Sequence, residues 1–416
     1  RKEASITESQ MSGKWPGGVI SKTAPTVTGP TDGEGGSASG IWTLDQVADY
    51  EKQGLWPLPV LPKTTFTCGQ NTWGPLGQGN TTNQSSPVQV GALTDWHMAY
   101  CGQDSVGAVK GDGTLWMWGR NTDGMLGLSN TTNYSSPKQI GALTNWRNIA
   151  LNRNHTVAVK TDGTLWAWGN GGYGKLGLGN TTTYSSPKQV GALTDWLSVA
   201  CGLYFSIALK SDGTLWGWGY NNLGQLGQNN TTNYSSPVQV GSYSDWAAME
   251  TGYASVCAVK TDGTLWGIGY NNNGQIGDGT KTNRSSPVQV GALTDWSRPS
   301  AVWYQHHCVK TDGTLWTWGD GYDGGTWHGN VSDRSSPVQV GALTTWSKSA
   351  GCGRRAMMAI KTDGTLWTGG GNTNGQLMQN NTTSISSPVQ VGSSTTWFGL
   401  GAQATAQYFS LAIKKV

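Results

Sequence analysis

The chain has 416 residues and a formal net charge of +3, with 62 Gly and 23 Trp but only 12% charged residues. This composition argues against a helical protein and favours short aromatic strands between tight turns. The basic residues are scattered and no apolar run approaches the roughly 18 residues of a membrane span, so neither nucleic-acid binding nor membrane insertion is expected.

The first 63 residues differ from the rest of the chain. Residues 1–40 are rich in Gly, Ser, Thr and Pro, and we expect an extended or flexible arm. Residues 41–63 contain a short helix signal, in which Thr43 and Gln46 have capping-box spacing, followed by a Pro-rich linker. The apolar side chains of this segment are candidates for docking onto a larger particle: Trp42, Leu44, Val47, Leu55 and Trp56.

Residues 64–416 form a repeat with a period of about fifty residues. Each copy is predicted to contain four short strands, which in the second full copy are Pro137–Gly141, a strand from Trp146, Thr156–Lys160 and Thr164–Gly169. The turn between the last two strands contains Asp-Gly, a sequence typical of tight hairpins. Four-strand units at this spacing are typical of propeller blades.

The ends of the repeat region indicate how many blades there are. The Ser-Ser-Pro signature occurs seven times but Thr-Leu-Trp only six times. The last copy, from Pro388, stops after three strands, whereas Thr65–Gly69 matches a fourth strand without the preceding three. We therefore predict an all-β, seven-bladed β-propeller of four-stranded blades, closed by pairing the N-terminal strand with the C-terminal three strands.

Two resemblances follow from these residues. The stretch His155–Asn180 (H-T-V-A-V-K-T-D-G-T-L-W-A-W-G and onward) recurs in every copy and resembles the regulator of chromosome condensation repeat, which implies the propeller fold. Members of that family include an exchange factor for a small GTPase and an inhibitor of β-lactamases. Residues 40–57 resemble a short motif of tailed-phage virion appendage proteins, which implies a particle-docking role.

No residue pattern predicts catalysis, a metal or a cofactor. The five histidines occupy non-equivalent positions, and we expect His155 to form a structural hydrogen bond. The adjacent pair His306 and His307 should point to opposite faces of a strand. The cysteines lack metal-ligand spacing and are expected to be small buried thiols. One Asp per copy occurs in an Asp-Gly turn, where a turn role is expected: Asp112, Asp162, Asp212, Asp262, Asp312 and Asp363.

A comparison between copies points to a binding face. The turns between strands one and two and between strands three and four hardly change, whereas those on the opposite side differ in almost every copy. We interpret the changing side as a recognition face, although packing against the arm or simple drift are alternatives. Its candidate residues are Asp104, Arg153, Asn154, Tyr173, Tyr204, Tyr220, Tyr253, Tyr270, Trp303, Tyr304, Tyr322, Arg354 and Arg355.

These observations favour a non-enzymatic, virion-associated appendage protein of a tailed bacteriophage. Its arm would bind other virion proteins, its changing face would bind a host-surface protein or glycan, and by analogy it would assemble as a homo-oligomer. The alternative is a secreted or cytosolic protein-binding propeller that acts as an inhibitor or scaffold. Exchange on a GTPase is disfavoured because we find no wedge-like insertion.

Overall fold

The computed structural model describes residues 27–28, 37–38, 63–351, 353–401 and 408–415, in two units, Arg1–Leu61 and Pro62–Val416. In the first unit β1 (Val27–Thr28) pairs antiparallel with β2 (Ser37–Ala38). The predicted helix and the docking candidates between Trp42 and Trp56 lie outside the described residues. No helix in the described ranges is long and apolar enough to cross a membrane.

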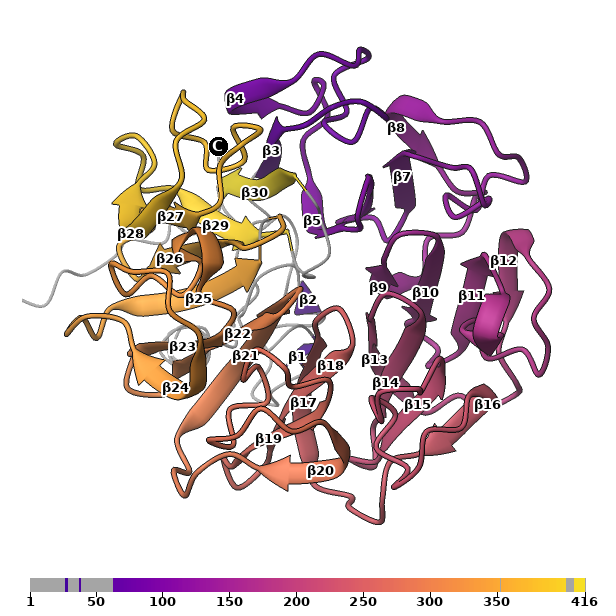
Figure 1. Cartoon of the computed structure of the whole chain (residues 1–416). Coiled ribbons are helices and arrows are strands. Elements are labelled where there is room, and N and C mark those ends of the chain that lie inside the picture. Colours follow the sequence, from indigo (N-terminus) through magenta and orange to yellow (C-terminus); the bar gives the residue numbers. More distant parts are fainter. Residues whose placement is uncertain (1–26, 29–36, 39–62, 352, 402–407, 416) are drawn as a thin grey trace, which may run out of the picture. The chain divides into compact units, whose positions relative to one another are not determined.

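In the second unit, seven four-stranded antiparallel sheets follow one another around a central axis (Figure 1), which confirms the predicted seven-bladed β-propeller. Each blade begins with a strand next to the axis and ends with the strand that carries Ser-Ser-Pro. The strands next to the axis are β5 (Trp96–Cys101), β9 (Trp146–Leu151), β13 (Trp196–Cys201), β17 (Trp246–Thr251), β21 (Trp296–Val302), β25 (Trp346–Gly351) and β29 (Trp397–Leu400).

The remaining strands follow in the same order in each blade. The second strands are β6 (Ser105–Lys110), β10 (His155–Lys160), β14 (Phe205–Lys210), β18 (Ser255–Lys260), β22 (Gln305–Lys310), β26 (Ala356–Lys361) and β30 (Phe409–Lys415). The third strands are β7 (Leu115–Gly119), β11 (Leu165–Gly169), β15 (Leu215–Gly219), β19 (Leu265–Gly269), β23 (Leu315–Gly319), β27 (Leu366–Gly370) and β3 (Lys63–Gly69). The outer strands are β8 (Tyr134–Gln139), β12 (Tyr184–Gln189), β16 (Tyr234–Gln239), β20 (Arg284–Gln289), β24 (Arg334–Gln339), β28 (Ile385–Gln390) and β4 (Gln84–Gln89).

The closing blade joins the two ends of the repeat region, but not in the predicted proportion. Its strand order is β29-β30-β3-β4, so two C-terminal strands pair with two N-terminal strands rather than three with one. The Ser-Ser-Pro strand β28 pairs with β27, with Gln390 opposite Trp367, and therefore completes the preceding blade. Similarity between the copies gives the order of the strands along the chain. It does not show that one sheet ends and the next begins after the Ser-Ser-Pro strand, where the chain returns to the axis.

A lysine held between tryptophans is repeated through the blades. Lys160 Nζ lies 4.9 Å from the Trp146 ring and 3.8 Å from the Trp166 ring. In the next blade the equivalent Lys210 also forms a 3.2 Å ion pair with Asp195. Cation–π contacts of this kind each contribute about 0.5–2 kcal/mol, depending on burial. The tryptophans that recur in every copy therefore serve blade packing, as the sequence predicts.

Candidate recognition face

The two faces of the propeller are formed by different sets of turns. On one face the Asp-Gly turn contacts the connection between blades: Trp146 N donates to Gly113 O at 3.2 Å. On the other face the turn between β5 and β6 contacts the loop after β7, where Arg120 N donates to Asp104 O at 2.9 Å. Counted from the Ser-Ser-Pro strand of each copy, these are the turns after the second and fourth strands. We call the two faces the uniform face and the variable face. The predicted division of turns between them is confirmed.

The repeated aspartates of the uniform face are used within their own turns. Asp162 Oδ1 accepts hydrogen bonds from Thr164 N at 3.0 Å and from Thr164 Oγ1 at 2.6 Å. These bonds lower the pKa of the Asp162 carboxyl. The same pair of bonds occurs at all six positions. The carboxylates are therefore turn residues, as the sequence predicts.

On the variable face, three tyrosines from two neighbouring blades form a cluster. The Tyr173 ring lies 5.6 Å from the Tyr204 ring and 4.9 Å from the Tyr220 ring, and Tyr204 and Tyr220 are 6.1 Å apart. The rings are inclined to one another by 56° to 77°. Tyr173 remains 49% exposed, so the cluster presents aromatic surface to solvent.

A second cluster comes from the following two blades. Tyr253 and Trp303 are stacked, with ring centroids 5.1 Å apart and planes inclined by 28°. Tyr304 lies 5.3 Å from Tyr253 and 5.5 Å from Tyr270. The turns that carry these rings are bonded across blades, because Tyr253 N donates to Trp303 O at 2.8 Å. Backbone bonding therefore holds the second cluster in place.

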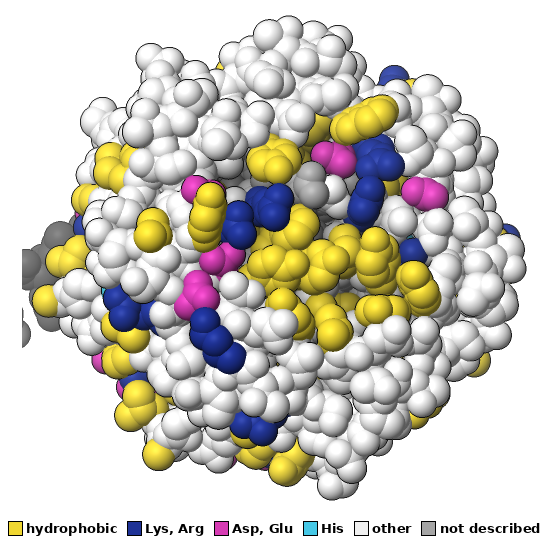
Figure 2. Space-filling model, in the orientation of Figure 1, with side chains coloured by type: hydrophobic (Ala, Val, Ile, Leu, Met, Phe, Trp, Pro, Cys, Tyr) yellow, Lys and Arg dark blue, Asp and Glu magenta, His cyan; other side chains and the backbone are white. Residues whose placement is uncertain are grey.

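The two clusters are continuous. Leu203 N donates to Tyr253 O at 3.0 Å, which fixes the turn of Tyr204 beside that of Tyr253. Burial, together with the neighbouring phenols of Tyr204 and Tyr220, raises the pKa of Tyr253. Figure 2 shows hydrophobic side chains gathered around the middle of this face, with Lys and Arg beside them. We call these rings the aromatic strip: Tyr173, Tyr204, Tyr220, Tyr253, Tyr270, Trp303 and Tyr304.

Arginines lie at the edge of this strip. The Arg354 guanidinium lies 4.9 Å from the centroid of the Trp303 ring. Arg355 lies 4.4 Å from the Tyr322 ring and its Nε is 2.7 Å from Asp320 Oδ2. The variable face therefore brings together aromatic and guanidinium groups of the candidate residues.

The other predicted residues have separate positions. Asp104 pairs with Arg120 at 3.5 Å, and burial raises the Asp104 pKa against the lowering effect of that arginine. Arg153 is exposed, whereas Asn154 is half-buried and its carbonyl accepts from Asn170 N at 2.7 Å. Tyr204 and Tyr304 accept the equivalent bond in their own turns, from Tyr220 N and Asp320 N.

Sequence comparison missed two partners of these candidates, Arg120 and Asp320. Both occupy the position directly after the third-strand Gly, where other copies have Tyr220 or Tyr270. That position varies between copies while its neighbours stay the same. The same variation that made Tyr220 and Tyr270 candidates could therefore also have pointed to Arg120 and Asp320.

The backbone is strained at several residues of the variable face. Tyr173 and Arg355 have φ of 63°, and Trp303 has φ of 36°. Bulky residues rarely adopt positive φ, and such conformations persist where surrounding contacts hold them. At these three residues the surrounding turns of the variable face hold the backbone in this conformation.

The histidines and cysteines form no catalytic arrangement in the described ranges. His155 Nε2 lies 3.1 Å from Ser206 Oγ, the structural bond that the sequence predicts. His306 contacts Ser255 in one neighbouring blade, while His307 contacts Ser349 in the other. Five cysteines are free and buried, namely Cys68, Cys101, Cys201, Cys257 and Cys308. No group of three potential metal ligands occurs among the described residues.

One buried acid was not anticipated. Glu250 lies on β17, three residues before Tyr253, and burial raises the pKa of its carboxyl to about 8. Its Oε2 atom is shielded from solvent and has no hydrogen-bond partner among the described residues. Equivalent positions carry Tyr100, Ala150, Ala200, Ser300 and Ala350, so an acid at a position that is uncharged in those copies was the available signal.

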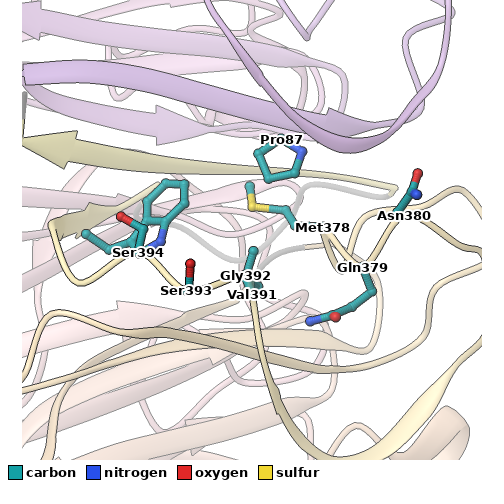
Figure 3. A pocket seen from close by; sticks show the side chains of 9 residues that line it. Pro87, Met378, Gln379, Asn380, Val391, Gly392, Ser393 and Ser394 are labelled. Carbon is teal, nitrogen blue, oxygen red and sulfur yellow. The ribbon is translucent and has the colours of Figure 1, made fainter.

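Grooves occur between neighbouring blades, away from the aromatic strip. One is lined by Pro87, Met378, Val391 and Trp397, among other residues (Figure 3). A second is lined by the equivalent residues of another blade pair, including Pro237 and Trp196. These grooves repeat with the blades and contain no group suited to catalysis, so they are features of blade packing.

Comparison with known proteins agrees with the repeat analysis. A family model described as an RCC1-like domain matches residues 148–407, and the regulator of chromosome condensation (RCC1) repeat matches residues 64–109 and 112–159. The resemblance to the regulator of chromosome condensation repeat is confirmed, whereas the similarity to a phage motif stays a prediction. No curated protein matches the chain.

Several solved structures have the same fold. Human WBSCR16 has a TM-score of 0.74 at 19% identity, covering 85% of this chain and 99% of that chain. Prp20p from Saccharomyces cerevisiae has a TM-score of 0.74 at 18% identity, with coverage of 86% and 93%. The yeast protein bound to Kap60 gives 0.73 at 17% identity, with coverage of 86% and 90%. At these identities the similarity establishes the fold alone.

Proposed function

Because the chain belongs to the family of RCC1-like domains, we propose that it is a non-enzymatic binding propeller whose variable face recognises a protein partner. The observation that carries this proposal is the confinement of the aromatic strip to one face of an otherwise repetitive molecule. Tyr, Trp and Arg are the residue types most enriched where protein interfaces derive their affinity. Loops on a rigid scaffold are also the usual place for recognition.

The partner class also agrees with what is described for a protein of the same fold. The yeast Prp20p structure is described together with its binding to Gsp1p and histones. That description supports a protein ligand as a class, and it names no partner for this chain.

Affinity purification from the native source tests the proposal. Two matched variants would be compared with the wild-type chain by quantitative mass spectrometry. The first replaces Tyr173 and Tyr322, which are 49% and 59% exposed on the variable face, with Ser. The second replaces Leu143 and Leu193, each 49% exposed on the uniform face, with Ser. We expect the first to lose specific partners and the second to retain them, and the reverse pattern would contradict the proposal.

The setting we favour is the surface of a tailed-phage particle, with the variable face directed at a host-surface molecule. This rests on residues 40–57 alone, which lie outside the described residues. Immunogold electron microscopy of the native source tests it directly. Repeated copies on virus particles would support an appendage role, whereas a chain found only free in solution would favour a secreted or intracellular inhibitor or scaffold.

Nucleotide exchange on a small GTPase is a second candidate because the family includes such an activity. Release of a fluorescent nucleotide from a GTPase captured with this chain would be the assay. Release no faster than the spontaneous rate would remove this candidate and leave partner recognition as the function.

A further inference from the structure

The charged groups around the aromatic strip indicate the chemistry of its partner, and this inference rests on the proposed recognition function. Two arginines of the variable face, Arg153 and Arg354, form no ion pair within the described residues. Arg153 is exposed, and Arg354 is half-buried with a shielded Nε that has no hydrogen-bond acceptor among those residues. Unpaired guanidinium groups at a recognition surface favour an anionic ligand.

Most acids of the variable face are already engaged. Asp104 pairs with Arg120, Asp320 pairs with Arg355, and Asp123 accepts a hydrogen bond from Asn170 Nδ2 at 3.1 Å. Asp323 lies in the short helical turn η2 (Tyr322–Gly324), on the loop between β23 and β24, and forms no ion pair in the described part. Asp104, which is within electrostatic range of Arg153, is thus shared with Arg120, and Asp320 is taken up by Arg355.

The buried acid of β17 does not compensate the two arginines. Burial raises the pKa of Glu250 to about 8, so this carboxyl is largely protonated near neutral pH. Arg153 and Arg354 both act electrostatically on phenols of the strip, Arg153 on Tyr253 and Arg354 on Tyr304. Both arginines thus lie within electrostatic range of the aromatic strip.

The orientation of Arg354 is set by stacking. Trp303 has Tyr253 stacked on it at 5.1 Å and the Arg354 guanidinium 4.9 Å from its ring centroid. A planar guanidinium that is stacked through its face presents its N–H groups at its edge, the geometry that binds a carboxylate with two hydrogen bonds.

The stack of Tyr253, Trp303 and Arg354 also indicates whether an acidic ligand would be a sugar or a peptide. A sugar ring packs on an open, flat aromatic face, but Trp303 is already in contact with Tyr253 and Arg354. The rings of Tyr173, Tyr204 and Tyr220 are steeply inclined to one another rather than coplanar. An uneven aromatic surface of this kind accommodates amino-acid side chains better than a row of sugar rings.

We infer that the variable face binds an acidic peptide segment of a protein, whose Asp or Glu carboxylates pair with Arg354 and Arg153 while neighbouring apolar side chains contact the aromatic strip. Arg354 supplies the oriented contact beside Trp303. Arg153 supplies the exposed contact, within electrostatic range of Tyr253.

Selection from a random-peptide display library on the full chain tests this inference without a known partner. We expect the enriched peptides to be rich in Asp and Glu next to apolar residues. One enriched peptide would then be synthesised and its affinity measured by calorimetry for the wild type, R153Q, R354Q and the control R147Q. Arg147 is exposed on β9, at the opposite end of that strand from the turn of Arg153.

A charge-assisted hydrogen bond lost at such a site corresponds to at least about a tenfold weaker affinity. We expect this loss in R153Q and R354Q but not in R147Q, with unchanged thermal unfolding by circular dichroism. Should R354Q fold poorly, R153Q alone decides, because its side chain is exposed and its removal disturbs no packing.

Three results would overturn the inference. The first is failure of the acidic preference. It would be seen either as enriched peptides without an excess of Asp and Glu or as unchanged peptide affinity in R153Q and R354Q. If the Tyr173 and Tyr322 double variant still abolishes binding in that case, recognition by the face stands and only its acidic preference fails. The second is no peptide enrichment together with Arg354-dependent capture of carboxylate sugars on a glycan array. The third is no enrichment on either probe.

Discussion

The uniform and variable faces of the propeller arise from the same repeat but differ in how similar their turns are from blade to blade. On the uniform face each turn repeats one arrangement, in which an Asp caps its own turn and a Lys lies between two Trp rings. On the variable face the turns are also bonded to one another, but their side chains differ and some of their backbones are strained. Repetition therefore marks what the fold needs, and departure from repetition marks the face that we propose binds a partner.

The largest expected difference comes from removing one aromatic ring from the repeated core and one from the variable face. Trp218 is fully buried and its Nε1 donates to Lys175 O at 2.9 Å, whereas Tyr322 is 59% exposed. We expect Trp218→Ala to lower the free energy of unfolding by about 3–5 kcal/mol. Tyr322→Ala should change it by no more than about 1 kcal/mol. Urea denaturation measures both, and similar losses would mean that the variable face is structural.

Glu250 offers a second test, because it departs from the repeat inside the fold. Its pKa is raised from 4.5 to about 8, so the folded chain holds a proton that the unfolded chain has released between these values. Stability should therefore fall as pH rises through this window, by about 1 kcal/mol per pH unit, and be unaffected by this group below it.

The variant E250Q carries no titrating group and should abolish this slope. Denaturation midpoints measured from pH 5 to pH 8 for both proteins provide the comparison. An identical pH dependence in the two proteins would show that Glu250 is ionised and solvated in the folded chain.

The smallest expected effect concerns backbone strain. Gly163 has φ of 75°, and an added Cβ would collide with Thr194 O, so Gly163→Ala should cost at least about 1–2 kcal/mol. Tyr173 has φ of 63° on the variable face, so Tyr173→Gly should relieve about 1 kcal/mol of strain, partly offset by lost ring contacts. A large destabilisation by Tyr173→Gly would contradict the view that this strain serves recognition.

Much of the fold was predictable because the number of blades can be counted from short signatures that recur in each copy. Seven Ser-Ser-Pro signatures against six Thr-Leu-Trp triplets gave the number of blades and the need for closure. The prediction that the closing blade has three C-terminal strands was wrong, because β28 pairs with β27 in the preceding blade. Similarity between copies shows which strands are equivalent, but it does not show which neighbouring strands share a sheet.

Candidate residues of the variable face could be recognised in the sequence where they depart from the repeat at a single position, as for Tyr173 and Trp303. The site was not predictable where a property depends on a neighbour from another part of the chain. The pairing of Arg355 with Asp320 and the shielding of Glu250 arise from the arrangement of strands around the axis. Local periodicity contains no information on such contacts.

Hydroxyl-radical footprinting of the chain in its native source and after purification tests the central claim most directly. If the variable face is the recognition surface, Tyr173, Trp303 and Tyr322 will be protected in the source and become reactive on purification, while Leu143 and Leu193 react equally in both. Protection of those leucines with unchanged reactivity of the aromatic residues would contradict this account and place the partner on the uniform face.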